Sequence, residues 1–212
     1  LSPDFSRDGH YLAYYVASAY ERTPNGFHYA PGNIVIRTLE TGEEREIALT
    51  PQLTDAGWGA HLRWAPDGRS ILILGSDDTG VFGIYQVEVG TGKASAVVSQ
   101  THQMPHWQRR RDFDFAEGEY LKYGEFSPDG KTIFYRRFYR SRNEEGEREA
   151  TQHRLIAQDV ETGEEREVYR DSRGTQGFQY AISPDGKHLL LASPEMLKIL
   201  PTAGGEPREP LK

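Results

Sequence analysis

A short string that ends in Asp-Gly occurs four times in this chain and restricts its fold more than any other feature. The copies are Phe5–Gly9, Trp64–Gly68, Phe126–Gly130 and Ile182–Gly186. Their closing glycines are 59, 62 and 56 residues apart. Self-similarity at a nearly constant period indicates a repeat architecture, in which each repeat is one small structural unit that packs on its neighbours.

A second string recurs between the copies of the first. Glu-Thr-Gly-Glu-Glu-Arg-Glu occurs at Glu40–Glu46 and again, letter for letter, at Glu161–Glu167, with weaker copies at Gly90–Lys93 and Thr202–Gly205. In both strings Gly supplies the positive φ that closes a tight hairpin, and the proline of Ser-Pro-Asp-Gly pre-sets φ at the second turn position. Two tight turns are therefore predicted in every repeat.

Segments typical of β-strands lie between these turns. They are rich in β-branched and aromatic residues and show no helical period. The segments are Tyr11–Val16, Asn33–Arg37, Ile71–Leu74, Gly83–Val89, Thr132–Tyr135, Leu155–Val160, Leu189–Ala192 and Met196–Leu200. Each repeat thus reads as strand A, the Asp-Gly turn, strand B, a variable loop, strand C, the Thr-Gly turn and strand D.

This order predicts an all-β protein built from four repeats of a four-stranded antiparallel sheet, the blades of a β-propeller. The blades span approximately residues 1–50, 51–100, 101–170 and 171–212 of a single domain, residues 1–212. The last strand D is expected at Glu206–Lys212. The residues expected to be buried at equivalent positions of the strands A are Phe5, Trp64, Phe126 and Ile182.

Two of the strings point to a particular kind of propeller. Phe126–Lys131 reads Phe-Ser-Pro-Asp-Gly-Lys and Gly204–Arg208 reads Gly-Gly-Glu-Pro-Arg, whereas the first repeat has Arg7 in place of the proline. These strings resemble the repeats of TolB-like (WD40-like) β-propellers, and the propeller domain of prolyl oligopeptidases carries similar repeats. The resemblance covers essentially the whole chain, as four copies. It is informative about the fold and not about the ligand.

The resemblance implies a larger ring of about six to eight blades, completed by additional blades or by a second chain. The alternative is a closed ring of four blades. It also implies a bacterial protein in the periplasm or another extracytoplasmic compartment. The cytoplasm stays open, since a chain without cysteine fits either compartment. The absence of cysteine also excludes disulfides, thiolate chemistry and Cys-ligated zinc.

Charge and hydropathy exclude two classes of partner. The formal net charge is −7, which argues against a nucleic-acid binder because such proteins need a basic face. No apolar run approaches the length that spans a bilayer. Neither a nucleic-acid partner nor a membrane span is predicted.

Three insertions are expected on one face, that of the B–C and D–A loops: Ser18–Gly32, Gln100–Tyr120 and approximately Tyr139–Gln152. Long loops on a rigid scaffold commonly bind partners, although aromatic residues in such loops also pack against the scaffold itself. Both interpretations stay open. If the face binds a protein or peptide, the candidate binding residues are Tyr29, His102, His106, Trp107, Arg109, Arg110 and Arg111.

The candidate chemical groups favour structural roles. Pro105 separates His102 from His106 and argues against helical metal-ligand geometry, so no metal and no cofactor are predicted. Arg109–Arg111 precede Asp112 and Asp114, which compensate their charge. Neither the Gly-x-Ser-x-Gly elbow of hydrolases nor a phosphate-binding Gly-rich loop is present. The residues assigned to structural turns are Asp8, Gly9, Asp67, Gly68, Asp129, Gly130, Asp185 and Gly186.

The favoured function is therefore a non-enzymatic module that binds or scaffolds a protein or peptide. The alternative is an enzyme, either a metal-dependent propeller lyase or the gating propeller of a peptidase.

Overall fold

The computed structural model describes residues 3–23, 26–54, 61–100, 118–142, 148–171 and 177–209, and every regular element in these ranges is a β-strand. The chain divides into two compact units. Unit 1 comprises Leu1–Ala116 and Leu121–Glu125, and unit 2 comprises Glu117–Tyr120 and Phe126–Lys212. Each unit is described by itself.

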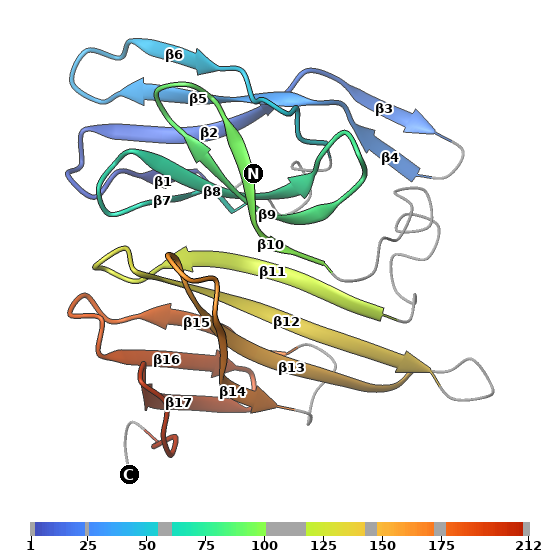
Figure 1. The fold of residues 1–212 in the computed structure, drawn as a ribbon, viewed down its shortest axis with the longest axis vertical. Coiled ribbons are helices and arrows are strands. Elements are labelled where there is room, and N and C mark those ends of the chain that lie inside the picture. The colour runs from blue at the N-terminus through green and yellow to red at the C-terminus, as the bar shows by residue number, and fades with distance from the viewer. Residues whose placement is uncertain are drawn as a thin grey trace. The chain divides into compact units, whose positions relative to one another are not determined.

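Unit 1 contains the first two blades (Figure 1). In both, the strands are antiparallel and lie side by side in chain order, as expected for strands A to D. Blade one consists of β1 (Asp4–Phe5), β2 (Tyr11–Ala17), β5 (Gly32–Thr38) and β6 (Glu44–Ile47). Blade two consists of β7 (Arg63–Trp64), β8 (Ser70–Ser76), β9 (Phe82–Glu88) and β10 (Ala94–Ser99).

The third and fourth sheets follow the same order. Blade three consists of β11 (Gly118–Phe126), β12 (Thr132–Arg142), β13 (Arg148–Asp159) and β14 (Glu165–Asp171). Blade four consists of β15 (Gln179–Ile182), β16 (His188–Ser193) and β17 (Met196–Pro201). Apart from the segment 121–125 of β11, these strands belong to unit 2.

The prediction of a complete fourth strand in blade four is wrong for the described residues up to 209. In place of a strand D, a single antiparallel bridge joins Ile199 to Arg208. Gly204 and Gly205 have φ of +95° and +131°, so the chain turns sharply after β17. Pro207, next to the bridge, has no N–H to donate to a ladder. Within residues 206–209, pairing is therefore limited to one bridge.

The expectation of loops in the first and third insertions is also wrong. Residues 18–32 contain a two-stranded sheet of β3 (Tyr20–Thr23) and β4 (Gly26–Tyr29). In blade three, β12 and β13 pair from Thr132↔Asp159 to Arg142↔Arg148. Both insertions are extensions of a B–C hairpin. Backbone hydrogen bonds between antiparallel strands can continue wherever the two segments of the chain stay side by side.

The core of unit 1 lies between its two blades. Alternate residues of β2 and β5 point to one face of blade one, and alternate residues of β8 and β9 point to one face of blade two, as the two-residue period of strands requires. Tyr15 is fully buried, and its hydroxyl donates a 3.2 Å hydrogen bond to the carbonyl of Leu53. The buried residues include Ala13, Tyr15, Ile34, Ile36, Ile71, Ile73, Tyr85 and Val87.

The core of unit 2 is formed in the same way by blades three and four. Phe134 of β12 lies in a buried cluster whose members come from both sheets. The Tyr180 hydroxyl donates a 2.7 Å hydrogen bond to the carbonyl of Phe134 and joins blade four to blade three. The cluster consists of Phe134, Leu155, Ala157, Val168, Phe178, Leu189, Leu191 and Leu200.

The residue that opens each repeat is not buried in every case, although burial was expected at all four positions. Trp64 is 8% exposed and Phe126 is 7% exposed, whereas Ile182 is half-buried. Phe5 is 60% exposed, which contradicts the prediction. The difference lies in the neighbours: blade one covers Trp64, whose ring stacks on Tyr11, whereas among the described residues of unit 1 no blade covers Phe5 in the same way.

The Asp-Gly turns are held by a repeated set of hydrogen bonds. In blade three the Ser127 hydroxyl donates to Oδ1 of Asp129 at 2.6 Å and accepts from the Thr132 amide at 2.9 Å. The Gly130 amide donates to the Ser127 carbonyl at 2.9 Å, and Gly130 has φ of +74°. Equivalent bonds form around Ser6 and Ser183 in blades one and four.

Candidate functional site

Most of the residues proposed from the sequence as a binding site lie outside the described part of the chain. These are His102, His106, Trp107, Arg109, Arg110 and Arg111. Tyr29 lies in β4, where its backbone pairs with Tyr20. Only the backbone of this hairpin is described.

The first kind of candidate site is a lengthened B–C hairpin, of which each unit has one. The β3–β4 ladder runs from Tyr20↔Tyr29 to Thr23↔Gly26. It continues from the blade through hydrogen bonds of 3.2 Å from the Ser18 amide to the Pro31 carbonyl and 3.1 Å from the Ala30 amide to the Ala19 carbonyl. In blade two, by contrast, the B–C hairpin ends at Ser76↔Phe82. In both insertions, therefore, hairpin ends extend beyond the blade.

The lengthened hairpin of blade three has a packed base. The Phe138 ring of β12 is buried, stacks on Tyr120 with a centroid distance of 5.0 Å, and lies 5.4 Å from the imidazole of His153. The Arg136 guanidinium lies 6.0 Å from the Phe138 ring and 5.7 Å from the Phe178 ring, and it donates to the Phe178 carbonyl. Beyond this base, Tyr139 is 44% exposed.

The turn aspartates lie at the other end of each blade and serve their own turns. Oδ1 of Asp8 accepts hydrogen bonds from the Ser6 hydroxyl and the His10 amide at 2.6 and 3.0 Å. The serine hydroxyl lowers the pKa of Asp8, Asp129 and Asp185, with a further contribution from the backbone amide two residues on. These carboxylates are therefore fully ionised acceptors at neutral pH, not general acids.

The second candidate feature is a cluster of three charged residues, one on the first strand of each of three successive repeats. Asp4, Arg63 and Glu125 each precede the aromatic residue of the repeated string, and all three belong to unit 1. Burial raises the pKa of Glu125, opposed by Arg63 and reinforced by Asp4. Burial likewise raises the pKa of Asp4, opposed by a hydrogen bond from the Trp64 amide and by Arg63. The charge of Arg63 thus acts on both carboxylates in a partly desolvated site.

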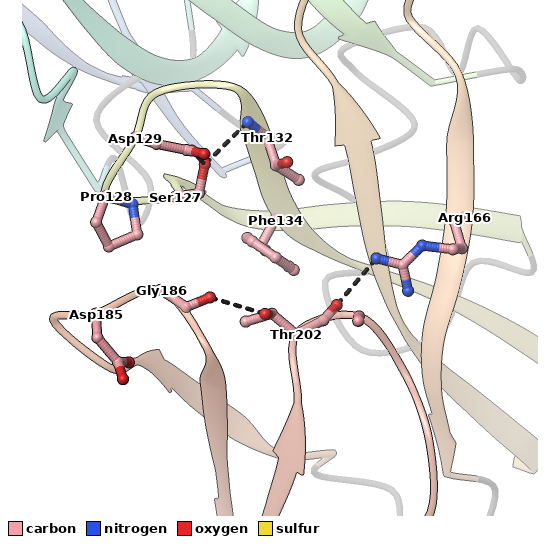
Figure 2. A pocket seen from close by; sticks show the side chains of 10 residues that line it. Ser127, Pro128, Asp129, Thr132, Phe134, Arg166, Asp185, Gly186 and Thr202 are labelled. Atoms are coloured by element: carbon pink, nitrogen blue, oxygen red, sulfur yellow. Dashed lines mark hydrogen bonds between the residues drawn. The ribbon is translucent and has the colours of Figure 1, made fainter.

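A third feature is a pocket of about 430 Å³ within unit 2, between blades three and four (Figure 2). Its lining comes from the Asp-Gly turns of both blades, from β12 and β14, and from the chain just after β17. Figure 2 shows Asp129 and Arg166 on opposite sides of the Phe134 ring. The lining residues are Ser127, Pro128, Asp129, Thr132, Phe134, Arg166, Asp185, Gly186, Thr202 and Ala203.

The wall beside Arg166 is fixed by three hydrogen bonds. Nη2 of Arg166 donates to the Thr202 carbonyl at 2.9 Å. The Thr202 hydroxyl donates to the Gly186 carbonyl at 2.7 Å, and the Thr202 amide donates to the Lys187 carbonyl at 2.9 Å. The equivalent arginine of blade one, Arg45, donates to the Val89 carbonyl at 3.1 Å. This arginine therefore joins consecutive blades in both units.

This pocket was not predicted from the sequence, although alignment of the repeats contains its signal. At the junction of blades one and two, Tyr11 and Trp64 stack with their centroids 6.4 Å apart. The equivalent residues at the junction of blades three and four are Thr132 and Ile182. Of these two smaller residues, Thr132 lines the pocket, where a ring like that of Tyr11 would occupy more of the space.

Two general findings concern the described residues only. No group of three or more His, Cys, Asp or Glu residues in those ranges is arranged to hold a metal ion. No helix in them is long and apolar enough to cross a bilayer.

Two solved structures of TolB proteins are similar to this chain in fold. The crystal structure of TolB from Acinetobacter baumannii is 20% identical, with a TM-score of 0.56 over 98% of this chain and 42% of that chain. A putative TolB from Agrobacterium tumefaciens is 16% identical, with a TM-score of 0.57 over 100% of this chain and 61% of that chain. This chain has a TolB-like β-propeller fold.

The same TolB-like fold is found in a peptidase. Pyrococcus horikoshii acylaminoacyl peptidase is 15% identical, with a TM-score of 0.63 over 100% of this chain and 32% of that chain. The chain thus spans between about a third and three fifths of the length of these three structures. No protein-family model matches the sequence, and no curated protein matches it significantly. At these identities the likeness establishes the fold alone.

Proposed function

We propose that this chain is a non-enzymatic β-propeller module that binds a protein or peptide through its lengthened B–C hairpins. The observation that carries the proposal is the pair of hairpin extensions in blades one and three. β12 has eleven residues and β8 has seven. At roughly 3.3 Å per residue, four additional residues extend the hairpin by about 13 Å.

The exposed backbone edges of such a ribbon are suited to a partner. Among the described residues, β3 and β4 form a sheet of two strands with no third neighbour. The outer edge of each strand presents N–H and C=O groups that an extended segment of another chain can pair with. The blade beneath holds the ribbon in place, so little conformational entropy is lost when a partner binds.

The proposed contact residues are the aromatic and basic residues of the insertions. Aromatic residues and arginine commonly contribute most of the binding energy of an interface. The set consists of Tyr29, His102, His106, Trp107, Arg109, Arg110 and Arg111.

A further blade, from the same protein or from a second chain, is the proposed neighbour of blade one. Trp64 is covered by the blade before it, and Phe5 is the equivalent residue of blade one with 60% of its surface exposed. Coverage of Phe5 by an equivalent blade would bury this aromatic surface. A bacterial, extracytoplasmic setting is proposed from the resemblance to TolB-like repeats.

Site-specific photocrosslinking in cells that express the protein tests the binding face. A benzoylphenylalanine in place of Tyr29 should form an adduct with one defined protein or peptide. The same group in place of Lys187, in the Asp-Gly turn of blade four, serves as the matched control and should not. Equal labelling from both positions, or from neither, would count against binding through the hairpins.

The alternative is the gating propeller of a peptidase. Its support is the similarity to Pyrococcus horikoshii acylaminoacyl peptidase over the whole of this chain. The complete reading frame distinguishes the two functions. A hydrolase domain with a Ser-His-Asp triad in the same polypeptide would favour the peptidase.

A further inference from the structure

We infer that the pocket between blades three and four binds a small zwitterion with an apolar body, of the size of a dipeptide. Its carboxylate would lie at Arg166 and its ammonium group at Asp129. This site is separate from the hairpins, since it is lined by the turns at the opposite end of the blades.

The pocket is specific to this pair of blades. At the junction of blades one and two, the stacked rings of Tyr11 and Trp64 occupy the equivalent positions. Thr132 and Ile182 are smaller, and the larger Phe134 replaces Ala13 to form an apolar floor. The resulting volume of about 430 Å³ is in the range of sites that take small molecules, about 300–1,000 Å³.

Arg166 supplies the basic end. Its Nη2 is held by the Thr202 carbonyl, which fixes the plane of the guanidinium at the pocket wall. A guanidinium has five N–H donors in a rigid fork, so one bond to a carbonyl leaves it able to pair with a carboxylate. Arg166 is exposed, and a ligand can therefore reach it from solvent.

Asp129 supplies the acidic end, on the other side of the Phe134 ring (Figure 2). Oδ1 accepts from the Ser127 hydroxyl and the Lys131 amide at 2.6 and 3.1 Å, which fixes the carboxylate. An ionised carboxylate has about four acceptor sites, so two bonds leave capacity for an ammonium group. Asp185 also lines the pocket, where its Oδ1 accepts hydrogen bonds from the Ser183 hydroxyl and the Lys187 amide of its own turn.

The middle of the pocket is apolar. The apolar side chains of Phe134, Pro128 and Ala203 all contribute to the lining. A ligand with charges at both ends and an apolar side chain between them matches this order of groups. Free amino acids and dipeptides with an apolar side chain have this chemistry.

Isothermal titration calorimetry with the dipeptide alanyl-phenylalanine tests the inference directly. The intact chain should bind the dipeptide saturably. The N-acetylated and C-amidated forms should each bind at least tenfold more weakly, because each lacks one charge. No saturable binding of the dipeptide, or equal affinity for the capped forms, would overturn the inference.

Substitutions locate the binding in the pocket. Arg166→Gln and Asp129→Asn should each weaken binding at least tenfold, and Asp129→Asn keeps an oxygen that can accept the turn hydrogen bonds. Thr132→Tyr restores the ring found at Tyr11 and should abolish binding while the melting temperature stays near that of the wild type. Arg170→Gln, on the same strand outside the pocket, is the control and should bind normally. Unchanged affinity in Thr132→Tyr would overturn the inference and leave the hairpin proposal untouched.

Discussion

The backbone amide of Trp64 donates a 2.8 Å hydrogen bond to Oδ2 of Asp4, sixty residues earlier in the chain. The Trp64 indole Nε1 also donates to the Asp4 carbonyl at 3.2 Å. One residue of blade one therefore receives two hydrogen bonds from the first strand of blade two. This pair joins the two blades of unit 1 at the position where each repeat begins.

Substitution of Asp4 tests the strength of that connection. Asp4→Ala leaves the buried Trp64 amide without its acceptor and should lower the free energy of unfolding by about 1–3 kcal/mol. Asp4→Asn retains an acceptor oxygen and removes a partly desolvated charge, so it should cost less. Urea unfolding at pH 7 measures both, and equal losses in the two variants would contradict the role given to the hydrogen bond.

Glu125 should make the stability of unit 1 depend on pH. Burial raises its pKa above the ordinary 4.5, so the folded state holds the proton to higher pH than the unfolded chain. The contribution of Glu125 to stability is thus full below about pH 4.5 and is lost as pH rises through the raised pKa. Glu125→Gln should therefore gain stability relative to the wild type between pH 4 and pH 7. Urea midpoints at the two pH values measure this gain, and a difference independent of pH would contradict it.

Two glycines with the same backbone conformation should differ in their tolerance of a side chain. Gly68 and Gly92 have φ of +69° and +74°. A Cβ at Gly68 would meet no atom within 4 Å, so Gly68→Ala should cost only the backbone strain, about 1–2 kcal/mol. A Cβ at Gly92 would lie 2.0 Å from the Ala48 carbonyl oxygen. Gly92→Ala should therefore lower the urea midpoint clearly more than Gly68→Ala.

A single substitution in the Asp-Gly turn of blade two should increase the stability of the protein. Ser6, Ser127 and Ser183 bridge the turn aspartate and a backbone amide, but the equivalent residue of blade two is Ala65. Ala65→Ser offers the Ser70 amide and the Asp67 carboxylate the same bridge. Since a hydrogen bond of this kind contributes about 0.5–1.5 kcal/mol, the variant should be more stable by that order. A lower melting temperature would show that the buried site of Ala65 has no room for the hydroxyl.

Much of the fold could be predicted from the sequence, because the repeated turns are local. The Asp-Gly and Thr-Gly strings specify hairpins through the φ of a few residues, and the distance between turns limits strand length. The TolB-like propeller fold and its strand order follow from these strings. The exposure of Phe5 could not be predicted from these strings. Whether a side chain is buried depends on the neighbouring blade that covers it, which the strings do not specify.

Other features depended on pairing that composition does not reveal. The segment 20–29 contains tyrosine, histidine and glycine in an order that fits either a loop or a strand, and it forms β3 and β4 because two chain segments run side by side. In blade four, strand D was expected at Glu206–Lys212, but the described residues up to 209 form only one bridge. The pocket was not predicted because its signal is the replacement of a ring, Tyr11, by the smaller Thr132, which appears only when the repeats are aligned with one another.

The most direct test of binding through the insertions is the affinity of a triple variant for the partner that crosslinks to position 29. Tyr29, Trp107 and Arg110 are changed together to Ala, and the dissociation constant and the melting temperature are both measured. If these residues contact the partner, binding is lost while the melting temperature stays within a few degrees of the wild type. A large fall in melting temperature with binding retained would show that these residues pack their own insertions and that the partner binds elsewhere.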